Sequence, residues 1–254
     1  MDFTPKRYKQ LLSAFRDAGY SFFTVEEFIR TSPDSRCVVL RHDVDRLPQH
    51  ALQLARIEES MQIRASYYFR VMKSSFHPGI IKKIADLGHE VGYHYEDLSL
   101  ANGDYGKAIS LFGQHLERLR QFCPISTVCM HGSPLSRIDN RLIWDKYDYR
   151  DYGIIGEPYF DIDYNKALYI TDTGRRWNDE SVNIRDRVEG LKTGRLKSSK
   201  EILQLLENGQ LNDMVVINTH PNTWHSNYIF WMLDLFYHWM KNRIKTWFIK
   251  SRRN

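Results

Sequence analysis

The stretch Cys37-Val-Val-Leu-Arg-His-Asp43 decides how this chain folds. Its leading residues are apolar, and polar residues stand on both sides of them. A short apolar run bounded in this way is typical of a strand buried on both faces of a parallel sheet. The stretch therefore predicts a buried strand that carries an aspartate at its carboxyl end.

Helical patterns and short strands alternate along the rest of the chain. We expect helices at residues 5–18, from Thr24 onward, and at 48–62, 78–87, 104–122 and 199–208. Further strands are expected at residues 65–71, 89–94, 126–131, 167–172 and 213–220. Such alternation predicts an α/β fold with a mainly parallel sheet covered by helices, either a barrel or a doubly wound layer.

The length of 254 residues is enough for one large α/β domain or two small ones. No internal repeat or low-complexity linker divides the chain, so we expect a single domain over residues 1–254. Residues 1–35 are expected to form a helical addition at its N-terminus. Residues 226–254, which are aromatic and then basic, predict a C-terminal helix.

The formal net charge of +5 is concentrated near the C-terminus, because no acidic residue follows Asp234. The rest of the chain is close to neutral and has no basic helix with a recognition motif, which argues against nucleic-acid binding. We expect the C-terminal helix to close the barrel with its Lys and Arg side chains in water. The alternative is an amphipathic helix that lies in the headgroup region of an anionic membrane.

The three cysteines, Cys37, Cys123 and Cys129, include no close pair, so neither a disulfide framework nor a cysteine zinc site is expected. The first residues lack the apolar segment of a secretory signal, and no apolar run is long enough to span a bilayer. These features predict a cytoplasmic protein, with peripheral contact at the inner face of the membrane as the alternative.

Five of the predicted strands end in a polar residue that can carry chemistry. These residues are Asp43, His94, His131, Asp172 and His220. In parallel α/β folds the carboxyl ends of the strands gather on one face, and functional sites are built there. We therefore expect these side chains to share one site.

Asp43 and Asp45, which are separated by one residue, are the sharpest local signal. One carboxylate can bind a metal while the other acts as a base, if their neighbours push the two pKa values apart. Alternatively, the two aspartates cap the following helix or pair with Arg41 and Arg46. The spacing alone leaves both interpretations open.

The stretch Gly88-His-Glu-Val-Gly-Tyr-His-Tyr-Glu-Asp97 places two histidines and three acids around a short strand. Zinc accepts imidazole nitrogen and carboxylate oxygen, and a hydrolytic site keeps one position open for water. His94, at the end of the strand, is the candidate ligand, whereas His89 is expected to be a hydrogen-bonded structural residue. His220 follows another apolar strand, where it could donate a proton to a leaving group or simply bond to the backbone.

Taken in order, these segments resemble the polysaccharide deacetylases, the NodB-homology group called carbohydrate esterase family four. The resemblance spans roughly residues 36–225 and implies an irregular (β/α)7 barrel. It implies that Asp43 is the catalytic base, that Asp45 and His94 bind a divalent metal, with zinc as the expected ion, and that His220 is the catalytic acid. Arg41 is then expected to orient Asp43 through a charge-assisted hydrogen bond.

The chain departs from the family's pattern in two places. The position that would hold another ligand histidine is Leu98, and the expected arginine motif is replaced by Cys129-Met-His131-Gly-Ser-Pro134. Either His131, or alternatively Glu96, completes the metal triad, or the metal site is lost and the protein only binds glycans. We expect His131 to be the third ligand, because it ends a strand at the same face.

The resemblance implies hydrolysis of an N-acetyl group on a carbohydrate, with deacetylases of O-antigen and surface-glycan biosynthesis as the most similar group. The substrate would be an N-acetylated sugar, nucleotide-linked or lipid-linked. The alternatives are a catalytically inactive, deacetylase-like protein that binds glycans or assists assembly, and a metal hydrolase that cleaves a C–N bond of a non-sugar substrate.

Four residues are candidates for contact with the substrate. Tyr95 and Glu96 follow the ligand histidine in the same segment. Arg175 and Trp177 lie in a glycine-containing turn and could grip an anionic sugar by charge and stacking. The alternative for that turn is a surface loop in which Trp177 packs as an anchor.

Overall fold

The computed structural model describes residues 1–132, 136, 138–179 and 186–251, with side chains described up to residue 243. The end of the predicted C-terminal helix, residues 252–254, lies outside these ranges. So do residues 133 and 134 of the segment that replaces the arginine motif.

One fully parallel, seven-stranded sheet forms the centre of the described fold. Its strands are β1 (Ser21–Phe23), β2 (Cys37–Val44), β3 (Ser66–Phe69), β4 (Glu90–Tyr95), β5 (Val128–Met130), β6 (Ala167–Thr171) and β7 (Met214–Thr219). They run in the order β5-β4-β3-β2-β7-β6. β7 lies along one edge of β2, and β1 and β3 pair in turn with the first and second halves of β2.

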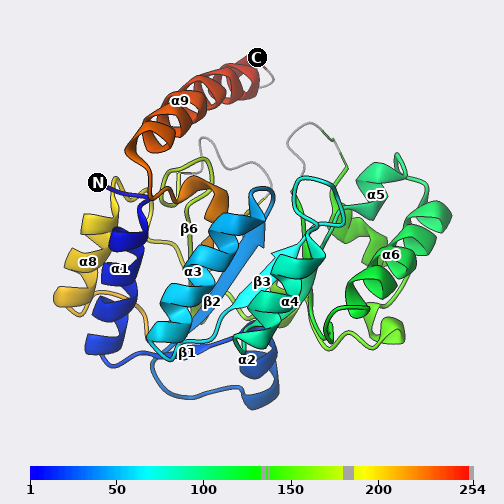
Figure 1. The fold of residues 1–254 in the computed structure, drawn as a ribbon, viewed down its shortest axis with the longest axis horizontal. Helices are drawn as coiled ribbons and strands as arrows, with labels where there is room; N and C mark the ends of the chain where they lie inside the picture. Colours follow the sequence, from blue (N-terminus) through cyan, green and yellow to red (C-terminus); the bar gives the residue numbers. More distant parts are fainter. Residues whose placement is uncertain (133–135, 137, 180–185, 252–254) are drawn as a thin grey trace.

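Helices cover the sheet, as Figure 1 shows for α3 and α4 in front of β2 and β3. The α-helices are α1 (Pro5–Asp17), α2 (Val25–Thr31), α3 (Pro48–Ser60), α4 (Pro78–Asp86), α5 (Asp97–Leu100), α6 (Tyr105–Arg120), α7 (Pro158–Asp161), α8 (Ser199–Glu207) and α9 (Tyr228–Ser251). The described residues also form short 3-10 helices, η1 (Asn140–Asp145), η2 (Tyr149–Tyr152) and η3 (Pro221–Thr223). Thr24 caps α2 as predicted, through a capping box with Glu27.

The predicted α/β class and irregular seven-stranded barrel are confirmed. Within the described ranges no ladder joins β5 to β6, so the curled sheet stays open between these two strands. One strand was not expected: β1 lies in the N-terminal segment for which the sequence predicted only helices. Its three residues are too few to produce a readable alternation of apolar and polar positions.

Strand β2, which contains the stretch Cys37–Asp43, is buried along its whole length, as predicted. Val38 and Leu40 pack into the larger apolar cluster beneath the helices, while Cys37 and Val39 pack into the smaller cluster on the other face. Because successive side chains point to opposite faces, Arg41 and Asp43 lie on the side of the smaller cluster, at its carboxyl end.

On the opposite face, next to His42, a fully buried carboxylate organises a polar network under α1 and α3. Glu58 accepts hydrogen bonds from the hydroxyls of Tyr8 and Tyr67 and lies 2.8 Å from Nε2 of His42. Nε2 of His89 lies 3.0 Å from the carbonyl oxygen of Ala55, so His89 is a hydrogen-bonded structural residue, as expected. This network is structural and lies on the face of the sheet opposite to Arg41 and Asp43.

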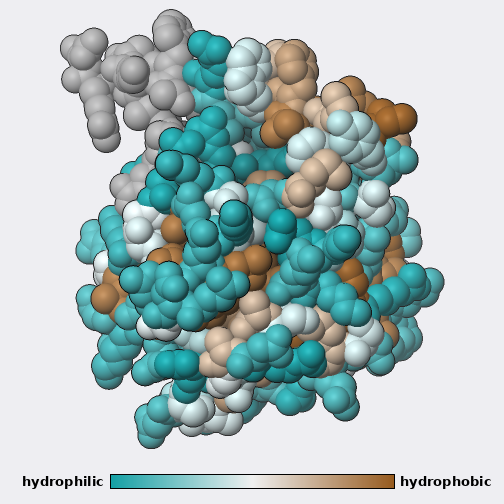
Figure 2. Space-filling model, turned by 90° about the vertical axis from the view of Figure 1, so that its left-hand side faces the viewer, coloured by the Kyte–Doolittle hydropathy of each residue, from teal (hydrophilic) through white to brown (hydrophobic). Residues whose placement is uncertain are grey.

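The C-terminal helix differs from the expectation that it closes the barrel. α9 projects from the body of the fold at the top of Figure 1, and brown and tan side chains gather in the same region of Figure 2. Many of its large apolar side chains are exposed rather than packed. Within the described ranges, no helix has the length and apolar character that crossing a bilayer requires.

Gly92 in β4 allows the ring of Tyr68 to lie directly against the backbone of the neighbouring strand. A Cβ atom at Gly92 would lie 2.3 Å from Cε1 of Tyr68. The ring is held in place because its hydroxyl forms a 2.9 Å hydrogen bond with the side chain of Thr127. The absence of a side chain at Gly92 is therefore a packing requirement of the sheet.

We expect Gly92→Ala to lower the free energy of unfolding by about 1–3 kcal/mol, because the added methyl group overpacks a fixed contact. Gly106→Ala is the matched control, since a Cβ there would meet its nearest atom at 3.6 Å. Being in α6, it should leave stability unchanged or raise it by up to about 1 kcal/mol. Urea unfolding of both variants measures the difference, and equal stability of Gly92→Ala and the wild type would contradict this packing account.

Candidate functional site

Three strand ends bring together a carboxylate and two imidazoles. Asp45 follows β2, His94 lies in β4, and His131 follows β5. Oδ1 of Asp45 lies 3.3 Å from Nε2 of His131 and 3.7 Å from Nε2 of His94. The predicted convergence of these side chains at the carboxyl edge of the sheet is therefore present in the structure.

The tautomer of His94 is fixed by its backbone contact. Its Nδ1 lies 2.9 Å from the carbonyl oxygen of Cys129, which can only accept a hydrogen bond, so Nδ1 carries the proton. Burial lowers the pKa of His94 to about 4, so the ring is neutral near pH 7. Nε2 then offers its lone pair toward Asp45, as a metal-binding histidine does.

His131 is held between two carboxylates. Its Nδ1 lies 2.9 Å from Glu96, and Nη2 of Arg70 donates a 2.6 Å hydrogen bond to the same glutamate. Burial alone would lower the pKa of His131, but the negative charge of Asp45 and the hydrogen bond with Glu96 outweigh burial and raise it to about 9. In this form His131 is an imidazolium, and a bound cation would take the place of its Nε2 proton.

The carboxyl group of Asp45 stays ionised in these surroundings. Burial alone would raise its pKa, but the charge and hydrogen bond of His131, together with the charge of His220, outweigh burial and hold it well below its usual range. Asp45 therefore offers a carboxylate oxygen at any pH near neutrality.

The donor set fits a divalent cation. The ligand atoms of Asp45, His94 and His131 all lie within 4.8 Å of one another. Bonds of about 2.1 Å in tetrahedral geometry would separate two ligand atoms by about 3.4 Å, close to the 3.3 and 3.7 Å between Oδ1 of Asp45 and the two imidazole nitrogens. The buried Oδ1 atom of Asp45 also accepts no well-aligned hydrogen bond from the described residues, which leaves it available.

A second group of possible ligands shares His94. It consists of Asp43, His94 and Cys129. Burial raises the pKa of the Cys129 thiol well above its usual value, so this sulfur is protonated and a poor ligand in these surroundings. The group with His131 is the better candidate on these grounds.

Asp43 lies beside the proposed cation site and is anchored through one of its oxygens. Its Oδ2 accepts hydrogen bonds from Nη2 of Arg41 at 3.1 Å and from Nδ2 of Asn218 at 2.8 Å, and it lies 3.9 Å from Nε2 of His94. Its Oδ1 is buried and has no hydrogen-bond partner among the described residues. One oxygen is thus fixed while the other can take a proton.

Asp186 is a site residue that the sequence analysis missed. It lies 3.7 Å from Arg41, so Arg41 bridges two carboxylates, and it accepts hydrogen bonds from Tyr159 and Thr171. Burial alone would raise its pKa, but Arg41 and His220 outweigh burial and lower it to about 2. Asp186 follows neither a predicted strand nor a motif, and other acids occur near it in the loop, so the sequence carried no signal that singled it out.

His220 follows β7 and is paired with Asp172, the residue after β6. Its Nδ1 lies 2.7 Å from Oδ1 of Asp172, whose other oxygen accepts a 2.8 Å hydrogen bond from Nε1 of Trp224. Burial alone would lower the pKa of His220, but the hydrogen bond and charge of Asp172 outweigh burial, and the pKa rises to about 10. The negative charges of Asp45 and Asp43 raise it further, so His220 is a protonated imidazolium beside them.

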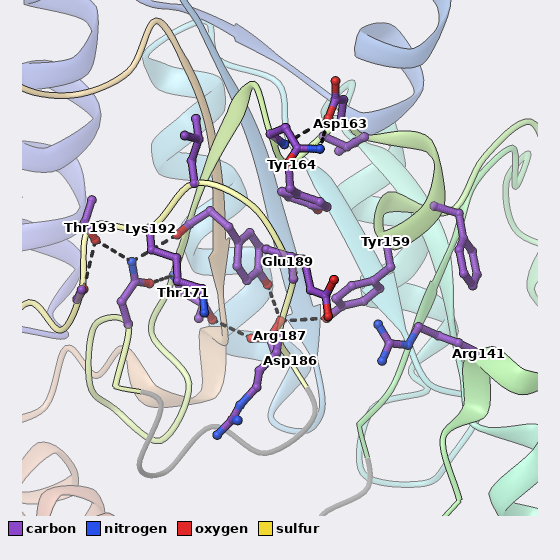
Figure 3. Close-up of a pocket in the computed structure, with 18 of the residues that line it drawn as sticks. Arg141, Tyr159, Asp163, Tyr164, Thr171, Asp186, Arg187, Glu189, Lys192 and Thr193 are labelled. Atoms are coloured by element: carbon purple, nitrogen blue, oxygen red, sulfur yellow. Dashed lines mark hydrogen bonds between the residues drawn. The ribbon is translucent and has the colours of Figure 1, made fainter.

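A pocket of about 1290 Å³ opens next to the Arg41–Asp43 pair, and Figure 3 shows part of its lining. Tyr159 and Asp186, which both contact Arg41, lie on its wall, while Arg141 and Lys192 lie toward opposite sides of the view. The pocket is large enough for a sugar-sized ligand.

The residues predicted to contact the substrate lie elsewhere in the described structure. Tyr95 is fully buried against the core, where Nε1 of Trp144 donates to its hydroxyl, and Glu96 supports His131. Trp177 is buried as an anchor, with its Nε1 donating to Ser199, and Arg175 faces α9. None of these four is among the described residues that line the pocket.

Leu98, at the position where the family pattern has another histidine, is buried in the apolar core. In this chain the imidazole of His131 stands beside His94 instead, with their ring centres 5.1 Å apart.

Comparisons with known proteins gave structural likenesses only. No family model and no curated protein matches the chain. Among solved structures, IcaB from Ammonifex degensii has 16% identity and a TM-score of 0.48 over 82% of this chain and 89% of its own. The peptidoglycan deacetylase PdaC from Bacillus subtilis has 10% identity and a TM-score of 0.40 over 85% of this chain and 98% of its own.

A pseudoenzyme of the CE4 family from Bacillus anthracis has 14% identity and a TM-score of 0.44 over 84% of this chain and 62% of its own. This chain thus spans less than two thirds of the pseudoenzyme's length. Because all these identities and scores are low, the function of the present chain has to be argued from its own site.

We expect His131→Gln to weaken Zn²⁺ binding by more than about 100-fold, and Glu96→Gln to weaken it by about 10–100-fold, because Glu96 only supports a ligand. Cys129→Ser is the matched control and should leave the affinity unchanged. Competition with a chromogenic chelator measures the three affinities. If Cys129→Ser loses as much affinity as His131→Gln, the group that contains Asp43 and Cys129 binds the ion instead.

Proposed function

We propose that this chain is a metal-dependent hydrolase that removes an N-acetyl group from a sugar, leaving an amine and releasing acetate. The observation that carries the proposal is the grouping of a ligand set for one cation, an ionisable carboxylate and a protonated imidazole at one edge of the sheet. Asp45, His94 and His131 would hold the cation, Asp43 would act as the base, and His220 would act as the acid. In metal-assisted hydrolysis of an amide, the cation activates the carbonyl and the water, the base takes the proton of the water, and the acid protonates the departing nitrogen.

Two hydrogen bonds hold the carboxylate of Asp43, the proposed base, in position. Arg41 and Asn218 hold Oδ2 of Asp43, which leaves the buried Oδ1 to accept a proton from the attacking water. When bound, a divalent cation would act as a Lewis acid toward the acetyl carbonyl and make water more acidic, and zinc is our expected ion. The role of Arg41 is to position Asp43.

The proposed acid carries its proton before the reaction begins. Asp172 fixes Nδ1 of His220, so Nε2 is the nitrogen that would donate a proton to the departing amine. Amide nitrogen is a poor leaving group unless it is protonated as the C–N bond breaks. The pair of His220 and Asp172 meets this requirement.

The substrate class rests on the motifs that resemble those of polysaccharide deacetylases. We propose that the sugar belongs to a surface polysaccharide such as an O-antigen precursor, that it is nucleotide-linked or lipid-linked, and that the reaction takes place in the cytoplasm. The pocket beside Asp43 could take the sugar, because tyrosines and charged groups of both signs line it.

One observation favours a second candidate, an inactive glycan-binding or assembly protein: Leu98 stands where the family pattern has a ligand histidine. The position of His131 favours a catalytically active protein, since His131 supplies an imidazole beside His94. A related enzyme that cleaves a C–N bond of a non-sugar substrate would use the same machinery, and profiling acetylated sugars against other amides separates these two activities.

We expect Asp43→Asn to lower kcat by about 10²–10⁴-fold while the bound metal is retained, since the amide cannot accept the proton. Asp86→Asn, at an exposed position of α4, is the control and should keep full activity. Acetate release and metal content are measured on the same samples. Normal turnover by Asp43→Asn would show that the assigned base is wrong.

Asp172→Asn should change the pH dependence of kcat. His220 acts in its protonated form, so kcat holds below the pKa of His220 and falls as the pH rises through it. Loss of the Asp172 charge lowers that pKa, so the fall should begin about 1–3 pH units lower than in the wild type. A pH–rate profile checks this, and a uniformly lower kcat without a shift would mean that Asp172 has only a structural role.

A further inference from the structure

The side of α9 that faces the body of the fold is polar. Asp234, His238 and Asn242 are buried there. Asp234 lies 3.3 Å from Nη1 of Arg175, and Asn242 donates a 2.9 Å hydrogen bond to the carbonyl oxygen of Gly174. These contacts fix which face of the helix is turned toward the protein.

The opposite side of α9 is apolar and exposed. Ile229, Leu233, Phe236 and Met240 follow one another at intervals of three or four residues, so they share one face of the helix. Their exposed fractions are 66%, 60%, 60% and 44%. A surface helix normally turns its apolar face inward. Here the arrangement is reversed, and a contiguous apolar surface of this kind marks an interaction site.

The charge around this apolar face has one sign. Lys241 and Arg243 follow it on the same helix, and Arg243 lies 5.0 Å from the ring of Trp239. After Asp234 no acidic residue occurs in the sequence, and Asp234 itself is turned toward the body. The helix is also rich in Trp and Tyr, residues that favour the interface between lipid and water.

We propose that α9 docks this chain onto an anionic lipid surface, with the face formed by Ile229, Leu233, Phe236 and Met240 lying among the acyl chains. Apolar burial supplies the affinity, and the basic residues that follow are attracted to anionic headgroups. A second copy of the chain fits less well, since it would bring an equally basic segment without acids against this one.

The residues of the body that hold α9 through Asp234 lie at the same edge of the sheet as the proposed catalytic site. Arg175 belongs to the turn after β6, and Arg46, 3.5 Å from Asp234, follows β2 directly after Asp45. Docking would therefore hold this edge near the lipid surface, whatever reaction the site catalyses.

The test is cosedimentation of the full chain with vesicles of phosphatidylcholine alone and of phosphatidylcholine mixed with phosphatidylglycerol. We expect binding to the mixed vesicles that decreases with added salt, and little binding to the neutral ones. The double variant Leu233→Ser, Phe236→Ser should bind at least about tenfold more weakly, because two apolar anchors are lost. The control variant Leu100→Ser, Phe160→Ser changes the same residue types at exposed positions outside α9 and should bind like the wild type.

The proposal is overturned if the wild type does not bind the mixed vesicles, binds both kinds equally, or binds as well after the α9 substitutions. Sedimentation velocity without vesicles tests whether a second copy of the chain binds this face instead. A wild-type dimer that the α9 variant dissociates, together with no vesicle binding, would identify the face as a contact between copies of the chain. Since neither readout involves turnover, the outcome is independent of the proposed hydrolase activity.

Discussion

The compensation of the negative charge on Asp45 is the constraint on which the candidate site depends. A carboxylate oxygen that is removed from water needs positive charge beside it, and loss of one partner of a buried ion pair costs about 3–5 kcal/mol. Here Asp45 faces His131, His131 is held by Glu96, and Glu96 by Arg70. The four groups alternate in charge, so each lowers the cost of burying the next. A divalent cation fits at the Asp45 end, because it would supply positive charge beside Asp45 in place of the proton of His131.

The parallel sheet keeps two polar systems apart although their residues alternate along one strand. Arg41 and Asp43 point to the face of the smaller apolar cluster and its pocket, whereas His42 points to the other face, toward Glu58. Neighbouring residues of β7 contact the same two systems on opposite faces of the sheet. Asn218 donates a hydrogen bond to Asp43, and the hydroxyl of Thr219 lies 2.6 Å from Nδ1 of His42. A shift of register by one residue would exchange these faces, so the packing of β2 also fixes the chemistry at its end.

Much of the fold and part of the site could be predicted from the sequence, because each depends on a local pattern. Apolar runs located six of the strands, and the polar residues after them converge because parallel strands end at one edge. Asp186 could not be found in this way, since tertiary packing of a loop brings it to Arg41. The orientation of α9 could not be predicted either, because apolar residues occur around much of that helix. Its polar contacts with the body of the fold decide which face is turned outward. The roles assigned to the site residues remain predictions for experiment.

Anomalous diffraction from crystals grown with zinc is the most direct measurement of the central claim. The account predicts one peak at about 2.0–2.2 Å from a carboxylate oxygen of Asp45 and from Nε2 of His94 and His131. A peak bound by Asp43, His94 and Cys129, or zinc bound only elsewhere on the chain, would contradict it.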